Sequence, residues 1–291
     1  MCRLACTIRH TPDRWPSLRD VIALITGASS GIGEATARRL AREPGAVRLV
    51  LVARRADRLQ ALAEELSRAA NVHVTTVAAD ITDAGAPASI AAHVEEHHGR
   101  LDLLVNNAGA AWKARFADGG WENVQRHMAL NFDAQVRVTE ELLPRLRASA
   151  PSAIVNVAST AGRVGRAGTG AYSAAKFAFA GWTDSLHLEE ARHGVHVGLV
   201  LPGFVATEGF PQKELVGNWK TRWIVSTPEK VAEAILDAGP GGRAERYVPR
   251  VYWLGAVARI VLPALTRRVL MTGKLTPATK PDARDDGASG G

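Results

Sequence analysis

Short apolar runs alternate with segments of helical period along most of the chain. The runs at Val21–Thr26, Val47–Ala53 and Ala153–Val157 have the length and continuous apolar character of strands buried on both faces of a sheet. The segments between the runs place apolar residues on one helical face, as at Leu59 and Leu62. This repeated alternation predicts right-handed βαβ units. The expected fold is therefore α/β, with a doubly wound parallel sheet covered by helices on both faces.

The alternation defines one predicted domain, from residue 20 to about residue 240. Residues 1–19 form an N-terminal extension that lacks the apolar stretch of a signal peptide, and residues 241–275 form an amphipathic C-terminal extension. The stretch 204–226 has no clear period and is typical of a loop that covers a functional site. A polar tail rich in glycine and proline, at 276–291, is expected to be disordered.

Composition narrows the class of protein further. The chain of 291 residues has 36 Lys and Arg against 29 Asp and Glu, but these cations are spread out and form no nucleic-acid-binding motif. We therefore expect a small anionic ligand and no nucleic-acid partner. The absence of any run of about 18 apolar residues argues against a membrane-spanning helix. Cys2 and Cys6 lie with His10 in a pattern one ligand short of a structural zinc site, so we predict no metal and a reducing, cytoplasmic compartment.

A glycine-rich segment, Thr26 to Gly33, lies where the first predicted strand turns into the first helix. Glycines at such a turn let the backbone approach a pyrophosphate, which the amides at the helix N-terminus then bind. Because the segment opens a βαβ series, it indicates a dinucleotide-binding Rossmann fold rather than a structural turn alone. The residues predicted to contact the dinucleotide here are Gly27, Ser29, Ser30, Gly31, Ile32 and Gly33.

Three other segments match catalytic patterns by letter only. Residues 27–31 fit the G-x-S-x-G nucleophile elbow, but that elbow needs earlier strands to supply an oxyanion hole, and only one strand precedes it here. Residues 93–97 fit the H-x-x-E-H metalloprotease pattern, but they lie on a predicted solvent-facing helix with no obvious third ligand. Residues 173–176 fit S-x-x-K without the S-D-N and K-T-G motifs of β-lactamases. We assign none of these three functions.

Further motifs follow the glycine-rich segment in an order that is highly specific when taken together. Asn106-Asn107-Ala108-Gly109 follows the fourth predicted strand, Ser159 follows the fifth, and Tyr172 and Lys176 are four residues apart on the next helix. With T-G-x3-G-x-G at the first turn, this arrangement resembles the short-chain dehydrogenase/reductase family in its short-subunit form. The resemblance covers about residues 20–240 and implies a nicotinamide-dependent oxidoreductase built on one Rossmann domain.

The spacing of Tyr172 and Lys176 has a physical meaning of its own. Residues four apart share a helix face, so the Lys176 ammonium is expected beside the Tyr172 phenol. A free phenol has a pKa near about 10, and a neighbouring cation stabilises the phenolate and lowers that pKa. Ser159 follows a strand at the carboxyl edge of the sheet, where ligands of such folds bind. We expect its hydroxyl to donate to a substrate carbonyl oxygen.

The resemblance implies a role for each candidate residue. Tyr172 is the general acid that protonates a carbonyl oxygen as hydride arrives, Lys176 holds the nicotinamide ribose, and Ser159 polarises the carbonyl. Asn131, in a long predicted helix over 121–146, positions a water for the proton relay. The other implied cofactor contacts are Thr207 at the carboxamide, Asp80 at the adenine, and Ile81, Asn107, Ala108, Gly109, Pro202, Gly203 and Val205.

The end of the second predicted strand indicates which nicotinamide cofactor is bound. Relatives that bind NAD carry an acidic residue at this place, which accepts the ribose hydroxyls. Here Arg54 and Arg55 follow the strand, and a guanidinium suits the dianionic 2′-phosphate of NADP. Asp57 is the nearest acid and is expected in the first turn of the next helix. The sequence therefore favours NADP(H) over NAD(H).

The sequence constrains the substrate less closely. Aromatic residues expected near the pocket mouth suggest a bulky apolar carbonyl or alcohol, with packing of these rings on one another as an equal alternative. They are Trp112, Phe204, Phe210, Trp219 and Trp223. We expect a homodimer or homotetramer. A non-catalytic, regulatory NADP(H)-binding protein of the same fold is an alternative function, against which the presence of both Tyr172 and Lys176 argues.

The segment from Tyr247 to Leu270 adds a second alternative. Its apolar residues recur at roughly helical spacing, and Arg259, Arg267 and Arg268 supply a basic edge. Packing of this stripe on the core or on a second subunit is the simplest interpretation, and a lid over the pocket is another. Association with an anionic membrane surface is the third, which predicts a peripheral membrane reductase of lipophilic carbonyls.

Overall fold

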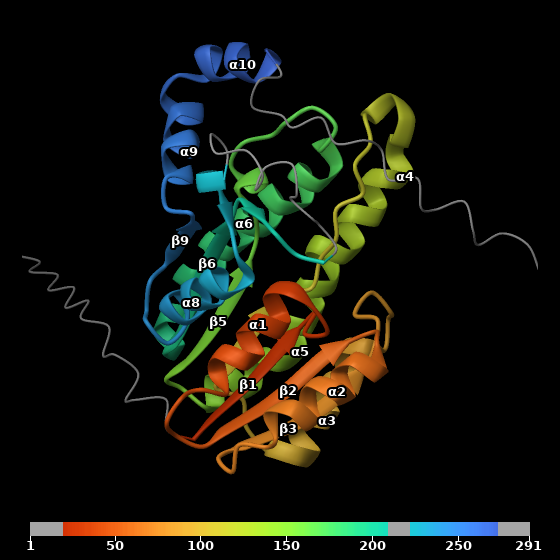
Figure 1. Ribbon diagram of the computed structural model, residues 1–291, viewed down its shortest axis with the longest axis vertical. Coiled ribbons are helices and arrows are strands. Elements are labelled where there is room, and N and C mark those ends of the chain that lie inside the picture. Colours follow the sequence, from red (N-terminus) through yellow and green to blue (C-terminus); the bar gives the residue numbers. More distant parts are fainter. Residues whose placement is uncertain (1–19, 209–221, 273–291) are drawn as a thin grey trace, which may run out of the picture.

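The computed structural model describes residues 20–208 and 222–272, and its centre is a parallel β-sheet with helices on both faces (Figure 1). The predicted N-terminal extension, 1–19, and the predicted tail, 276–291, lie outside the described residues. So does the middle of the predicted covering loop, 209–221.

Within the described residues, seven strands form the main sheet in the order β3-β2-β1-β4-β5-β6-β9, with every neighbouring pair parallel. Their bounds are β1 (Val21–Thr26), β2 (Val47–Ala53), β3 (Val72–Ala78), β4 (Leu103–Asn106), β5 (Ser152–Val157), β6 (Val195–Pro202) and β9 (Glu245–Val248). The strand order reverses between β1 and β4. In open α/β sheets the ligand binds at the carboxyl edge beside this reversal.

Strand side chains alternate between two hydrophobic cores, one on each face of the sheet. In β1, Val21, Ala23 and Ile25 belong to one core, while Ile22 and Leu24 belong to the other. This follows from the two-residue period of a strand, and it explains why the buried strands have continuous apolar sequences.

Three helices complete each core. The first core is covered by α1 (Gly31–Leu40), α2 (Ala56–Leu66) and α8 (Pro228–Ala238), and the second by α3 (Ala86–His98), α5 (Ala134–Ala148) and α6 (Gly170–Glu190). Each helix contributes one apolar stripe, such as Leu59, Leu62 and Leu66 of α2. The predicted doubly wound fold is thereby confirmed.

The long helix predicted over 121–146 contains a break in its regular winding. The structure has α4 (Phe116–Met128), then a π-helical turn, η1 (Ala129–Asp133), and then α5. Asn131 lies buried within this π-helical turn. The spacing of apolar residues along the sequence does not show that one helical turn contains an extra residue. Such π-helical turns occur frequently at functional sites.

The sheet continues past residue 240, where the sequence predicts that the domain ends. Strand β9 pairs with β6, placing Glu245 opposite Leu199 and Val248 opposite Pro202. Its sequence, E-R-Y-V, is too short and too polar to show a strand pattern. Helices α9 (Tyr252–Val261) and α10 (Pro263–Met271) follow it. The predicted extension 241–275 therefore begins with a strand of the main sheet.

A second, two-stranded parallel sheet joins the two ends of the predicted covering loop. It consists of β7 (Phe204–Val205) and β8 (Val225–Ser226), with Phe204 opposite Val225. This pairing fixes the chain on both sides of the segment that lies outside the described residues.

Close packing between β6 and α8 generates a stability prediction. A Cβ atom on Gly198 would lie 2.0 Å from the carbonyl oxygen of Ala238, so Gly198→Ala forces the strand and the helix apart. We expect a loss of about 1–3 kcal/mol in the free energy of unfolding, measured by chemical denaturation. Gly181→Ala is the control, because no atom lies within 4 Å of the added methyl group and alanine favours the helix. Equal unfolding midpoints for the two variants would contradict this packing.

Candidate active site

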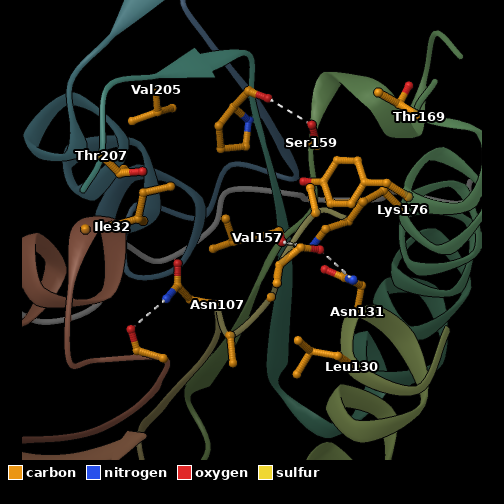
Figure 2. A pocket seen from close by; sticks show the side chains of 18 of the residues that line it. Ile32, Asn107, Leu130, Asn131, Val157, Ser159, Thr169, Lys176, Val205 and Thr207 are labelled. Atoms are coloured by element: carbon orange, nitrogen blue, oxygen red, sulfur yellow. Dashed lines mark hydrogen bonds between the residues drawn. The ribbon is translucent and has the colours of Figure 1, made fainter. Parts of the chain in front are cut away.

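The carboxyl edge of the main sheet opens into one large pocket of about 1440 Å³ (Figure 2). Every residue that the sequence assigns to the cofactor or to catalysis lines this pocket, with the exception of Gly33. In Figure 2, Ile32, Asn107 and Thr207 lie on one side of the space, and Lys176 and Asn131 lie on the other. The structure therefore brings the candidate residues together, while their individual roles stay predictions.

The glycine-rich loop passes so close to its neighbours that side chains would not fit. Gly27 has φ +69°, and a Cβ there would lie 2.8 Å from the Cα of Ala108. A Cβ on Gly33 would lie 2.4 Å from the carbonyl oxygen of Gly27. Gly33 therefore shapes the loop from behind without lining the pocket.

The N-terminus of α1 faces the pocket without a side-chain cap. Ser30 is the N-cap residue, and its hydroxyl makes no capping hydrogen bond. The first amides of a helix have no partner within the helix, and they carry a partial positive charge. This loop and helix end therefore fit the pyrophosphate of a dinucleotide.

Thr26 ties the glycine-rich loop to the N-N-A-G loop. Its buried hydroxyl oxygen accepts hydrogen bonds from the backbone amides of Asn107, at 2.9 Å, and Ala108, at 3.0 Å. The side-chain amide of Asn107 donates in return to the carbonyl oxygen of Thr26 at 2.9 Å. Gln135 on α5 donates to the carbonyl oxygen of Ala108. Sequence reasoning missed Gln135, because its partner lies 27 residues away along the chain.

Two arginines and two serines form a polar cluster where the sequence places the 2′-phosphate. The Arg55 guanidinium donates to the hydroxyl oxygens of Ser30, at 2.7 Å, and Ser29, at 3.0 Å. The Arg54 side chain is 75% exposed, and its guanidinium lies 3.4 Å from the Asp80 carboxylate. Burial acts to raise the pKa of Asp80, but hydrogen bonds from Thr82 and the charge of Arg54 hold it below its usual value.

Ser159, Tyr172 and Lys176 meet on the opposite wall of the pocket. Ser159 and Tyr172 both line this wall, and the Ser159 hydroxyl acts to lower the pKa of Tyr172. The Ser159 hydroxyl accepts a hydrogen bond from the amide of Ala161 at 3.1 Å and donates one to the carbonyl oxygen of Pro202 at 3.3 Å (Figure 2). Lys176 is 3% exposed, and its ammonium donates to the carbonyl oxygen of Val157 at 3.0 Å and lies 5.9 Å from the centre of the Tyr172 ring.

The pKa shifts on this wall differ from the sequence-based prediction that Lys176 lowers the pKa of Tyr172. Burial lowers the pKa of Lys176 to about 7, and it raises the pKa of Tyr172. The groups that act to lower the pKa of Tyr172 are the Ser159 hydroxyl and the Arg166 guanidinium, and Lys176 is not among them. The reason is that Nζ of Lys176 points to the Val157 carbonyl, while its charge is itself disfavoured by burial.

Arg166 is therefore a pocket residue that sequence reasoning missed. It lines the pocket, and its guanidinium carbon lies 4.8 Å from the centre of the Phe204 ring. The segment 163–169 carries no motif, so only the fold brings this cation near Tyr172.

Asn131 presents an unused acceptor beside this wall. Its side-chain amide donates to the carbonyl oxygens of Ala110, at 3.0 Å, and His127, at 3.2 Å. Its buried Oδ1 has no partner among the described residues, and a Cβ on Gly109 would lie 2.7 Å from it. Buried acceptors of this kind are usually satisfied by ordered water.

The predicted aromatic residues divide between several positions. Phe204 lines the pocket, whereas Trp112 packs against His127 outside the lining, and Trp223 is exposed. Phe210 and Trp219 lie outside the described residues.

Of the two sequence patterns that resemble metal sites, one lies within the described residues and one lies outside them. His93 and His97 of the H-x-x-E-H pattern lie side by side on α3, with ring centres 4.1 Å apart. The described ranges 20–208 and 222–272 contain no group of three potential metal ligands. Cys2, Cys6 and His10 lie outside them. Within the same ranges, no helix has the length and apolar character needed to cross a membrane.

The sequence was compared with known families and proteins. It matches the family described as short chain dehydrogenase over residues 21–215. The chain belongs to the short-chain dehydrogenase/reductase family. A ketoacyl reductase, HetN, from Nostoc sp. is 30% identical over 256 residues, covering 88% of this chain and 85% of that protein. A putative ketoacyl reductase from Streptomyces coelicolor is 37% identical over 228 residues, covering 76% of this chain and 84% of that protein.

Solved structures of other short-chain dehydrogenases share the fold. L-Sorbose reductase from Gluconobacter frateurii, in complex with NADPH and L-sorbose, superimposes with a TM-score of 0.71 at 27% identity, covering 79% of this chain and 95% of that one. Alcohol dehydrogenase from Thermococcus sibiricus, in complex with 5-hydroxy-NADP, superimposes with a TM-score of 0.69 at 28% identity. The match covers 78% of this chain and 94% of that one. These relatives support an oxidoreductase activity for this short-chain dehydrogenase.

The close approach behind the glycine-rich loop predicts the effect of one methyl group. Gly33→Ala should displace the carbonyl of Gly27 and thus the loop that faces the pyrophosphate site. We expect the affinity for a nicotinamide dinucleotide to fall about tenfold or more, measured by isothermal titration calorimetry. Gly165→Ala, where no atom lies within 4 Å of the added methyl group, should leave the affinity unchanged. Equal affinities for the two variants would show that the loop does not hold the dinucleotide.

Proposed function

We propose that this short-chain dehydrogenase transfers a hydride between NADP(H) and a carbonyl or secondary-alcohol substrate, with Tyr172 as the general acid and base. The observation that carries the proposal is that Ser159, Tyr172 and Lys176 line the same pocket as the glycine-rich loop, with Nζ of Lys176 5.9 Å from the centre of the Tyr172 ring. The NADPH and 5-hydroxy-NADP complexes of the two structural relatives support the choice of cofactor class.

The pocket residues divide the proton chemistry among them. In reduction, the Tyr172 phenol gives its proton to the carbonyl oxygen, and the Ser159 hydroxyl donates a hydrogen bond that stabilises the charge developing there. Oδ1 of Asn131 holds a water beside Lys176, so that Tyr172 regains its proton from solvent. When bound, NADPH would supply the hydride for this reduction. In oxidation of an alcohol the same groups act in the reverse direction, and bound NADP⁺ would accept the hydride.

The polar cluster at the end of β2 supports NADP(H) over NAD(H). The Arg55 guanidinium contacts the hydroxyls of Ser29 and Ser30, and the exposed Arg54, which pairs with Asp80, occupies the place of the acidic residue of NAD-binding relatives. A carboxylate at this point would bind ribose hydroxyls and repel a 2′-phosphate, whereas guanidiniums form charge-assisted hydrogen bonds with it.

The remaining pocket wall has both apolar and charged residues. Its apolar members are Ala110, Ala114, Phe204, Leu270 and Met271, and its charged members are Lys113, Arg115, Asp118 and Arg166. The apolar members support an apolar substrate. We propose a bulky apolar carbonyl or alcohol. The proposed assembly is a homodimer or homotetramer, because α4 exposes Phe116 and Trp121 to solvent in the single chain.

Replacing Tyr172 with phenylalanine removes the transferable proton and little else. Tyr172→Phe should lower turnover of a ketone about 100- to 10,000-fold, which is the usual contribution of general acid catalysis. The NADPH dissociation constant should change by less than about threefold, because the ring and Lys176 remain. Steady-state kinetics and calorimetry measure the two quantities. Retention of more than about a tenth of the wild-type rate would show that Tyr172 is not the proton donor.

Reversing the charge at the end of β2 should change the cofactor preference. Wild-type protein is expected to bind NADPH more tightly than NADH, and Arg54→Asp should reduce the ratio of the two dissociation constants about tenfold or more. Arg68→Asp makes the same change of charge at an exposed residue outside the pocket lining, and the ratio should stay unchanged. Equal dissociation constants for NADPH and NADH in the wild type would contradict the assignment.

A further inference from the structure

Helices α9 and α10 carry an extensive apolar surface that other described elements leave uncovered. They form the blue end of the molecule in Figure 1, where α10 runs across the top. The residues of this surface, which we call the apolar face, are 40–79% exposed: Trp253, Leu254, Val257, Ile260, Val261, Leu262, Leu265, Val269 and Met271. A patch of this kind on a folded protein usually marks an interaction site.

The apolar face is held outward by the way α9 packs on the rest of the protein. Tyr252 donates to the carbonyl oxygen of Ile224 at 3.0 Å, and its ring fills the space where a Cβ on Gly203 would lie 2.2 Å away. Ala256, one turn later, is the only residue of α9 with a fully buried side chain. Tyr252 and Ala256 therefore pack one edge of α9 against the rest of the protein. Further along the helix, Val257 and Ile260 are exposed.

The chain segment that carries the apolar face has only positive charges. Residues 246–272 contain five arginines and no aspartate or glutamate. Arg246 pairs with Asp237 at 2.8 Å. The other four, Arg250, Arg259, Arg267 and Arg268, have no ion pair within the described ranges. An apolar stripe with tryptophan and unpaired cations matches an anionic lipid surface, where the apolar side chains enter the acyl boundary and the arginines meet headgroup phosphates.

A second copy of this chain fits the same face less well. In a two-fold contact each surface meets itself, so the arginines of one copy would approach those of the other. The segment 246–272 offers no acid to neutralise them. Like charges placed opposite each other oppose association, whereas an anionic surface gains from all four cations.

The apolar face also adjoins the mouth of the active-site pocket. Leu270 and Met271, at the end of α10, line that pocket. We propose that α9 and α10 bind an anionic membrane surface, and that the pocket takes a lipophilic carbonyl substrate directly from that surface. The substrate route rests on the proposed reductase function, whereas the lipid contact does not.

Co-sedimentation of the full chain with vesicles tests the lipid contact. Wild-type protein should pellet with phosphatidylcholine vesicles that contain about 30% phosphatidylglycerol, less so at high salt, and not with phosphatidylcholine alone. Ile260→Glu should lower the bound fraction about tenfold, because it places a charge at a residue that is 77% exposed on the apolar face. Leu188→Glu is the matched control, since Leu188 is 76% exposed on α6, and it should bind as the wild type does.

Two results would overturn the lipid contact. One is wild-type protein that stays in the supernatant with anionic vesicles at low salt. The other is an Ile260→Glu variant that binds as well as the wild type. Gel filtration completes the test, because an oligomer that Ile260→Glu dissociates, in a protein that binds no vesicles, assigns the face to a second copy instead.

Kinetics separate the substrate route from the proposed function. Ile260→Glu should reduce a short water-soluble ketone at the wild-type rate, while its rate with a long-chain ketone dissolved in anionic vesicles should fall at least about fivefold. Equal loss on both ketones, or on neither, would contradict the route. If wild-type protein reduces no ketone while it still binds anionic vesicles, the proposed function fails and the lipid contact stands.

Discussion

The hydroxyl of Thr26 joins the two loops on which the whole pocket depends. It accepts hydrogen bonds from two backbone amides of the N-N-A-G loop, and it lies at the end of β1, beside the reversal in strand order. Loss of such a buried acceptor would leave two amides unsatisfied, at a cost of about 1–3 kcal/mol each. Because Gly27 follows directly, the same contact sets the distance between the glycine-rich loop and Ala108. The cofactor site therefore depends on one side chain in the core.

The catalytic wall depends on groups that burial leaves incompletely satisfied. Lys176 has three donors and one described acceptor, the Val157 carbonyl, while Oδ1 of Asn131 has no described partner. These groups face the same space from α6 and from the π-helical turn, so water or a ribose hydroxyl can connect them (Figure 2). Ser159 and Tyr172 line the same wall, where the proposed function places the transfer of a proton to a carbonyl oxygen. Incomplete hydrogen bonding in the apo pocket is thus consistent with a proton relay.

Local sequence patterns predicted the strand and helix order and most pocket residues, because buried strands and glycine-rich turns have characteristic patterns within a few residues. Elements that depend on partners far away in the sequence have no such local pattern. Strand β9 is recognised only by its pairing with β6, and Arg166 only by its position near Tyr172. The pKa of Tyr172 also depends on where Lys176 points, which helical spacing does not determine. The apolar pattern of α9 and α10 was visible in the sequence, but their exposure was not.

In the proposed reaction, hydride passes between NADP(H) and a carbonyl carbon in this pocket. Mass spectrometry of the alcohol formed by the wild-type chain from an apolar ketone and NADPH with deuterium at both C4 positions of the nicotinamide tests this transfer. We expect one deuterium at the carbinol carbon of the product and one deuterium left at C4 of the oxidised cofactor. Oxidation of NADPH with no deuterium in the alcohol, or no alcohol from any ketone tested, would contradict it.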